Sequence, residues 1–168
     1  GDSLVTLSTD LTTDPTQGDV PFGTLTTMSE SPIRFGLIYV GTDDGMIHLS
    51  KDGGYTFSLL SAKLPKGLYV SRVLASAYSE SRVYATMNGY RNDHFNAYVY
   101  VSNDYGTTWT QIMKDLPLEA VNVITEDNIS SQVLYVGTDG GLYVSTDGGA
   151  SSMGWNKGLP NAVPIHDI

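Results

Sequence analysis

The stretch Ser102-Asn103-Asp104-Tyr105-Gly106-Thr107-Thr108-Trp109 decides the fold of this chain, because it joins two strand-like segments through a tight turn. Residues 98–101 lead into it, and residues 107–112 lead out of it. Asp104 can accept hydrogen bonds from backbone amides of the turn, and Gly106 can adopt a positive φ without steric cost. We expect Trp109 to fold back over the hairpin as an apolar plug. The stretch therefore predicts a β-hairpin.

The same pattern occurs twice more, as Ser50-Lys51-Asp52-Gly53-Gly54-Tyr55-Thr56-Phe57 and, in a damaged form, as Ser145-Thr146-Asp147-Gly148-Gly149-Ala150. In the damaged copy, residues 151–154 separate Gly149 from Trp155, so we expect a loose or bulged plug. The aspartates recur after 52 and then 43 residues, within the period of propeller blades. The residues expected to build the three turns are Ser50, Asp52, Gly54, Phe57, Ser102, Asp104, Gly106, Trp109, Ser145, Asp147 and Gly149.

The composition is that of strands joined by tight turns, and it excludes several classes of partner. The 168 residues include eleven Tyr and 18 Gly, and only 16% are charged. A net charge of −9 argues against binding to nucleic acid or to an anionic membrane surface. The absence of cysteine excludes disulfides, thiolate zinc sites and a cysteine nucleophile. No apolar run approaches the roughly 20 residues of a membrane span, so we expect no membrane insertion.

The order of the expected strands divides the chain into repeating units of four strands. Residues 1–21 read as an incoming strand and a loop, with the strand at 4–7. Residues 22–65, 66–117 and 118–160 each read as one blade ending in a Leu-Pro pair, and 161–168 as the first strand of a further blade. The expected strands lie at 22–28, 37–41, 46–50, 55–60, 70–77, 82–87, 98–101, 107–112, 121–125, 133–137, 142–145 and around 155.

Three blades do not close a ring, since propellers have about four to eight. An unclosed stack exposes sheet edges. We therefore expect the chain to be a segment of a larger propeller or to close by pairing with a second copy. The start Gly1-Asp2-Ser3 lacks the features of a signal peptide, which fits a mature form or an excised piece.

The turns resemble the Asp-box, or BNR, repeats of sialidases, sortilin-like receptors and photosystem-assembly-factor-like bacterial exported proteins. The phrases that carry the resemblance are residues 39–45, 102–109 and 135–145. The resemblance implies a β-propeller of four-stranded antiparallel blades, with the box between the third and fourth strands. It also implies an extracellular or periplasmic location in bacteria.

The aspartates of the boxes can be interpreted as calcium ligands, as catalytic acids or as acceptors that close the turn. Ca²⁺ needs six or more oxygens gathered at one place, whereas each box supplies one carboxylate. We therefore expect a structural role for these aspartates, with no catalytic residue, metal or cofactor.

The opposite face of the blades is the better candidate for binding, because the second-to-third turns and the links between blades meet there. Loops on a rigid scaffold are where function concentrates. A segment that combines Tyr, Arg, Asp and His can stack on a ligand and hydrogen-bond to it, although a solvated long hairpin is an equally simple interpretation. The candidate ligand-binding residues are Tyr90, Arg91, Asp93, His94, Asp43, Asp44 and Asp139.

Other residues give weaker signals. His48 reads as a packed or edge histidine, and His166 and Asp167 point to opposite faces of a strand. Asn128-Ile129-Ser130 fits a glycosylation pattern of low specificity. Neither the arginine constellation of a sialidase nor a defined pair of glycosidase carboxylates is apparent.

The sequence therefore favours a non-catalytic scaffold or binding segment of an exported propeller protein, which engages protein or glycan opposite the Asp-boxes. The alternative is a part of a glycoside hydrolase, sialidase-like or other, whose catalytic set is incomplete in this chain.

Overall fold

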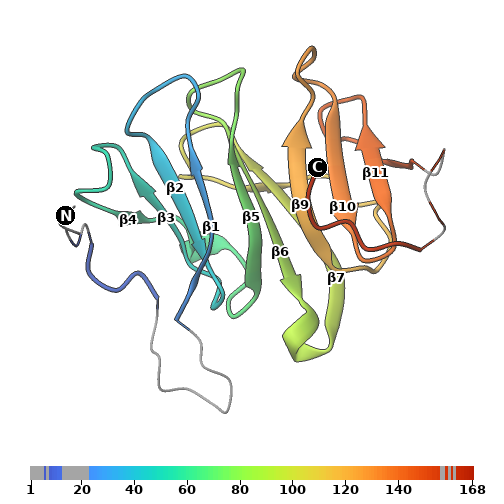
Figure 1. Cartoon of the computed structure of the whole chain (residues 1–168), viewed down its shortest axis with the longest axis horizontal. Coiled ribbons are helices and arrows are strands. Elements are labelled where there is room, and N and C mark those ends of the chain that lie inside the picture. The colour runs from blue at the N-terminus through green and yellow to red at the C-terminus, as the bar shows by residue number, and fades with distance from the viewer. Residues whose placement is uncertain (1–5, 7, 13–22, 156–157, 159, 161) are drawn as a thin grey trace, which may run out of the picture.

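The regular structure of the described chain consists almost entirely of antiparallel β-sheets (Figure 1). A computed structural model describes residues 6, 8–12, 23–155, 158, 160 and 162–168. The first sheet contains β1 (Leu25–Glu30), β2 (Ile38–Thr42), β3 (Ile47–Ser50) and β4 (Ser58–Leu59). The second contains β5 (Tyr69–Ala75), β6 (Val83–Gly89), β7 (His94–Ser102) and β8 (Thr110–Gln111). The third contains β9 (Val121–Glu126), β10 (Leu134–Thr138), β11 (Leu142–Ser145) and β12 (Met153–Gly154).

Each sheet is a four-stranded meander in which every strand pairs with the next one along the chain. This confirms the expected all-β fold of about three four-stranded antiparallel units. Of the strand expected at 4–7 only residue 6 is described, and most of the loop that follows lies outside the described residues. Two short 3₁₀ helices, η1 (Ser61–Lys63) and η2 (Tyr90–Asn92), occur between strands. No helix in the described ranges has the length and apolar character needed to cross a membrane.

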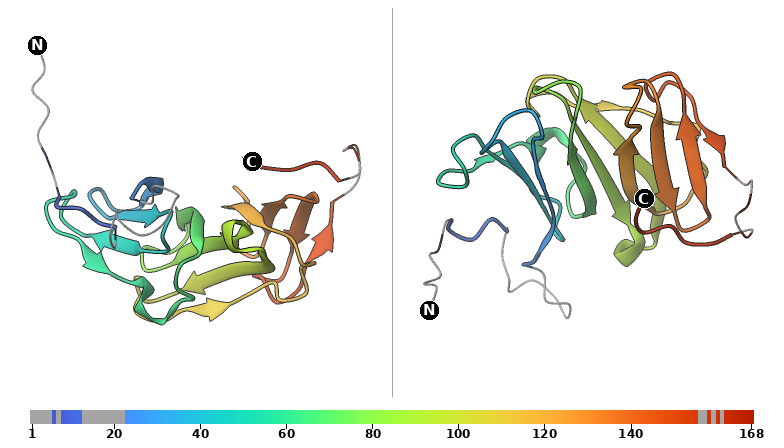
Figure 2. Two further views of the ribbon diagram at one scale, coloured as in Figure 1. Left: turned by 90° about the horizontal axis from the view of Figure 1, so that it is seen from below. Right: turned by 45° about the horizontal axis from the view of Figure 1, so that its top comes forward.

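The sheets pack face to face and fan out along an arc (Figure 2). Strand β5 packs on β1 and β2, and β9 packs on β5 and β6. One buried cluster lies between the first and second sheets and includes Tyr39, Leu49 and Val73. A second cluster lies between the second and third sheets and includes Tyr84 and Ile124. The core is therefore divided into layers between sheets, as expected for neighbouring blades.

The Ser-Asp turns, which we define as residues 50–56, 102–108 and 145–151, join the third and fourth strands of each sheet. In the first, Ser50 Oγ donates to Asp52 Oδ1 over 2.8 Å and accepts from the Gly54 N–H, also over 2.8 Å. The Asp52 carboxylate accepts from both the N–H and the hydroxyl of Thr56, at 2.9 and 2.6 Å. The second turn repeats these bonds with Ser102, Asp104, Gly106 and Thr108.

The third turn has the same bonds as the first two, although its sequence pattern is altered. Ser145 Oγ donates to Asp147 and accepts from the Gly149 N–H, and Ser151 supplies the same two donors as Thr56. The turn stays intact because all its bonds involve a serine, an aspartate, a backbone amide and a hydroxyl four residues beyond the aspartate. Only the aromatic residue is displaced, and Trp155 is 45% exposed.

Several strand boundaries differ from the expectation: β1 ends at Glu30 and not at residue 28, and β5 ends at Ala75 and not at residue 77. The fourth strands are only two residues long, since Thr56 and Thr108 give their N–H groups to the aspartates and not to the ladder. The third strand of the second sheet starts at His94, which pairs with Gly89. The segment between the strands expected at 82–87 and 98–101 is therefore partly paired and not entirely a loop.

The indole of Trp109 does not simply cover its own hairpin. It is half-buried and packs against the cluster between the first and second sheets. Its Nε1–H donates to the carbonyl of Leu60, over 3.3 Å, in the chain that leaves the first sheet. Trp109 therefore contributes to the packing between the first and second sheets.

The Ser-Asp turns lie on one face of the fan, beside the first-to-second turns. The N–H of Gly53 donates to Gly36 O, that of Tyr105 to Ser81 O and that of Gly148 to Gln132 O. The second-to-third turns lie on the other face with the links between sheets, where Asp139 N donates to Ala120 O. We call this other face the cleft face.

Candidate functional site

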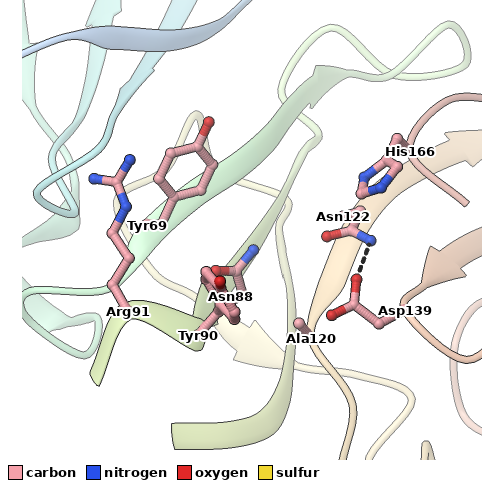
Figure 3. Close-up of a pocket in the computed structure, with 8 residues that line it drawn as sticks. All are labelled: Tyr69, Asn88, Tyr90, Arg91, Ala120, Asn122, Asp139 and His166. Carbon is pink, nitrogen blue, oxygen red and sulfur yellow. Dashed lines mark hydrogen bonds between the residues drawn. The ribbon is translucent and has the colours of Figure 1, made fainter. Parts of the chain in front are cut away.

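A cleft of about 370 Å³ opens on the cleft face, between the second and third sheets (Figure 3). Strands β5 and β6, helix η2, the start of β9, the β10–β11 turn and the C-terminal segment all contribute to it. The lining residues are Tyr69, Asn88, Tyr90, Arg91, Ala120, Asn122, Asp139 and His166.

One side of the cleft is aromatic and cationic. The Arg91 guanidinium lies over the ring of Tyr69, 5.1 Å from its centroid, and one of its nitrogens is 3.6 Å from Asp43 Oδ2. Tyr90 is 64% exposed, which leaves its ring accessible to a ligand. The aromatic and cationic groups on this side can stack on the flat face of a sugar ring or of a peptide unit.

The other side presents amide and carboxylate groups. Asn122 Nδ2 donates to Asp139 Oδ1 over 2.9 Å (Figure 3), and this bond orients both side chains at the rim. Asn88 comes from β6, beside Tyr90 (Figure 3), and is only 8% exposed; it donates across to the carbonyl of Val121. Amides and carboxylates held in this way offer both donors and acceptors, which suits a ligand rich in hydroxyl or amide groups.

The C-terminal segment, residues 162–168, supplies the last wall. Ile165 N donates to Thr138 O over 2.9 Å, and Ile165 lies so close to Gly137 that a Cβ there would be 2.6 Å from its Cγ2. A salt bridge of 2.8 Å between Arg72, on β5, and Asp167 joins the same segment to the second sheet. These contacts leave His166 facing the cleft (Figure 3), a position that our sequence analysis did not assign to it.

Asp43 does not line the cleft. Its side chain is buried and accepts from the N–H groups of Gly23 and Thr24 and from the Thr24 hydroxyl. Burial pushes the pKa of the Asp43 carboxyl upward. These donors and the Arg91 guanidinium outweigh that effect, so the pKa lies below its ordinary value. Asp43 therefore holds the start of β1 and the guanidinium of Arg91 in place.

Three further candidates also lie outside the cleft. Asp44 accepts from the Thr42 hydroxyl within its own turn. Asp93 has a left-handed backbone, with φ 53°, and ends η2. His94 stacks on Tyr98 and its Nε2 lies 2.6 Å from the Tyr98 hydroxyl.

Tyr90, Arg91 and Asp139 are thus the sequence candidates that the structure brings together. Sequence reasoning missed Tyr69, Asn88, Ala120 and Asn122, which no local motif marks. Tyr69 and Asn88 are cross-strand partners on β5 and β6. Their place in the cleft could be predicted only once the register of these two strands was known. Nowhere in the described part of the chain do three or more His, Asp or Glu side chains gather closely enough to hold a metal ion.

The chain is similar in sequence to one known enzyme and in fold to several solved structures. No family model matches the chain. A xyloglucanase of Hypocrea jecorina (strain QM6a) is 31% identical over 121 residues, which are 70% of this chain and 14% of that enzyme. The chain therefore spans a small part of the length of the curated relative that it matches.

Two solved structures illustrate the structural likeness. The GH74 xyloglucanase of Xanthomonas campestris has a TM-score of 0.65 at 17% identity, over 83% of this chain and 24% of that one. YCF48 bound to D1 peptide has a TM-score of 0.60 at 17% identity, over 78% and 40% of the two chains. At this identity the likeness concerns the fold, and both neighbours are propeller proteins. The chain is a partial β-propeller of three four-stranded blades.

Proposed function

We propose that the chain is a non-catalytic binding segment of a β-propeller protein, and that the cleft between its second and third sheets binds a polysaccharide. One observation carries the proposal: two tyrosines, two asparagines and a carboxylate from two neighbouring sheets line the same cleft. Sugar rings present an apolar face for stacking and a rim of hydroxyls for hydrogen bonds, and this cleft offers partners for both. The identity with a xyloglucanase supports a glycan over other ligands.

A binding measurement with xyloglucan tests this proposal, by affinity electrophoresis or calorimetry. Tyr90→Ala should weaken binding about tenfold, since stacking on one ring contributes up to about 1.5 kcal/mol. Tyr55→Ala is the matched control, because Tyr55 is 78% exposed in the first Ser-Asp turn, on the other face. Equal effects of the two changes, or no binding by the unaltered chain, would argue against a glycan site in this cleft.

Part of a glycoside hydrolase is the second candidate, favoured by the enzymatic relative. Glycosidases use two carboxylates, about 5–9.5 Å apart according to mechanism. Among the described residues that line the cleft, Asp139 is the one carboxylate. An assay for reducing ends released from xyloglucan separates the candidates. We expect no release from this chain, and release that Asp139→Asn abolishes would favour the hydrolase.

A peptide is the alternative ligand, since the YCF48 neighbour binds a D1 peptide. The asparagines of the cleft can also bond to a peptide backbone. Competition between an unstructured peptide mixture and xyloglucan distinguishes the two ligands, and we expect only the polysaccharide to bind.

We also propose that the Ser-Asp turns make the chain a member of the BNR, or Asp-box, class, related to the sortilin-like and photosystem-assembly-factor-like proteins. By the same resemblance we place the protein outside the cytoplasm of a bacterium, extracellular or periplasmic. The bonding pattern of the three turns supports the class, and fractionation of the native source tests the location.

A further inference from the structure

The three sheets repeat one four-stranded unit, so residues of the cleft can be compared with their counterparts in the other sheets. The first strand of each sheet has one extra residue relative to the second strand, which is a β-bulge. The extra residues are Thr26 in β1, Ser71 in β5 and Asn122 in β9. Asp43 and Asp139 are counterparts too, because each follows the second strand and donates its N–H to a carbonyl just before the first.

In the first two sheets the extra residue joins its sheet to the next one. The Thr26 hydroxyl donates to the carbonyl of Val70 in β5, over 2.6 Å. The Ser71 hydroxyl donates in the same way to the carbonyl of Val121 in β9, over 2.7 Å. The extra residue therefore has a structural role in these two sheets.

Asn122, the extra residue of the third sheet, forms a different bond. Its Nδ2 donates within the sheet, to Asp139 Oδ1 over 2.9 Å. The place of the next first strand is nevertheless occupied, since Ile165 lies against Gly137 as Val70 lies against the corresponding glycine of the first sheet. Asn122 has thus left the structural pattern of the repeat and serves the cleft.

Asp43 shows what the aspartate of the second-to-third turn does in a structural role. Its carboxylate accepts hydrogen bonds from the N–H of Gly23 and from both the N–H and the hydroxyl of Thr24. The side chain is only 2% exposed. These bonds hold the carboxylate against its own sheet, away from solvent.

Two of these three donors are missing around Asp139. Glu119, the counterpart of Gly23, donates its N–H to the carbonyl of Pro117, over 2.9 Å. Ala120, the counterpart of Thr24, has no hydroxyl. Asp139 is consequently exposed, and the described residues give a hydrogen bond to its Oδ1 but none to its Oδ2. The same turn therefore presents its carboxylate to the cleft in the third sheet.

We propose that Asp139 and Asn122 form the polar anchor of the cleft, which binds two neighbouring hydroxyl groups of one sugar ring. The inference rests on the proposed glycan binding and names the groups that recognise the glycan. Asp139 Oδ2 accepts a charge-assisted hydrogen bond from one hydroxyl, and the second hydrogen of Asn122 Nδ2 donates to the other. The bond between the two side chains keeps these groups side by side (Figure 3).

Calorimetric titration with a xyloglucan oligosaccharide tests the anchor. Asp139→Asn and Asn122→Ser should each weaken binding about tenfold, because each removes a hydrogen bond to the ligand. Asn122→Ser places in the third sheet the residue that the second sheet has at Ser71, so β9 should keep its bulge. Asp115→Asn is the matched control and should bind like the unaltered chain, because Asp115 bonds to Ser152 beside the third Ser-Asp turn, on the other face.

Ala120→Thr withdraws the Asp139 carboxylate from the cleft without changing the aspartate. The new hydroxyl should bond to Asp139 as that of Thr24 bonds to Asp43. Affinity should therefore fall while the melting temperature does not, a result that a merely structural role of Asp139 would not give. Ala120 is 3% exposed, so a variant with a lowered melting temperature is set aside and the other two variants decide.

An O-methylated oligosaccharide separates loss of the anchor from general damage to the cleft. Methylation removes the hydroxyl donors and keeps the ring faces, so the unaltered chain should prefer the unmodified ligand about tenfold. This preference should shrink in Asp139→Asn. Equal losses of affinity for both ligands would overturn the inference.

Two further results would overturn the anchor, and they differ in what they say of the proposed function. If Asp139→Asn and Asn122→Ser bind the oligosaccharide like the unaltered chain, the anchor is wrong and glycan binding stands. If the unaltered chain binds no oligosaccharide, both are wrong.

Discussion

The Trp109 indole N–H donates to the carbonyl of Leu60, 3.3 Å away, and thereby ties the second Ser-Asp turn to the chain that leaves the first sheet. Leu60 also packs closely against Gly106, which has a φ of 85°, so that a Cβ at that glycine would displace the Leu60 side chain. The turn of one sheet therefore supports the end of the preceding one.

Replacing Trp109 by alanine should lower the free energy of unfolding by about 2 kcal/mol. The expected loss is smaller than the roughly 3–5 kcal/mol of a fully buried Trp, because the ring is half-buried. Trp109→Phe should cost less, since it keeps the apolar contact and loses one hydrogen bond of about 1 kcal/mol. Urea denaturation of the three proteins measures both differences. An alanine variant as stable as the parent would mean that the indole contributes nothing between the sheets.

Tyr39 offers the opposite case, in which removing a polar group helps. Its ring is fully buried between the first and second sheets, and its hydroxyl has no hydrogen-bond partner among the described residues. Burial and the nearby Tyr105 and Glu80 raise the pKa of this phenol, so it stays neutral. Tyr39→Phe should leave stability unchanged or raise it by about 1 kcal/mol.

Tyr135→Phe is the matched control for that change. Tyr135 occupies the same place in the third sheet, but its hydroxyl donates to Asp127 Oδ2 over 3.0 Å. This variant should lose about 1 kcal/mol of stability. If thermal melting shows Tyr39→Phe to be the more damaging of the two, the Tyr39 hydroxyl must have a partner.

The Ser-Asp turns should make the protein sensitive to acid. Hydrogen bonds from Thr56 lower the pKa of Asp52 to about 2, and those from Thr108 and Ser151 do the same for Asp104 and Asp147. The ordinary value is 3.8, so the lowered pKa contributes stability above about pH 4 that is lost as the pH falls towards 2.

Thermal melting between pH 6 and pH 2 measures this loss. The melting temperature of the parent should fall steeply below about pH 4. Asp104→Asn removes one of the three carboxylates, so its melting temperature should be lower at pH 6 and fall less on acidification. Parallel curves for the two proteins would show that the Asp104 carboxylate does not contribute in this way.

The turns could be predicted from the sequence because their bonds are local. Each carboxylate is bonded to groups at most four residues away, so a short motif contains the whole geometry. The repeat of that motif then led to the number and order of the sheets. The third copy keeps the residues that bond within the turn and differs in its aromatic residue, Trp155, which is 45% exposed.

The cleft could be predicted only in part because it depends on distant contacts. Tyr90 and Asp139 lie in turns whose face follows from strand order alone. Asn122, in contrast, reaches the cleft because the third sheet packs beside the second. Asp43 looked like an accessible turn residue, yet it binds Thr24, 19 residues earlier, and this contact has no local signature.

Binding of a polysaccharide between the second and third sheets, on the cleft face, can be observed residue by residue. The most direct test is an NMR titration of the isotope-labelled chain with xyloglucan oligosaccharide. We predict shifts of the Asn88 and Asn122 side-chain amides, while the backbone amides of Gly54, Gly106 and Gly149 in the Ser-Asp turns stay in place. Shifts confined to those glycines, or no shift at saturating oligosaccharide, would mean that no glycan binds in the cleft.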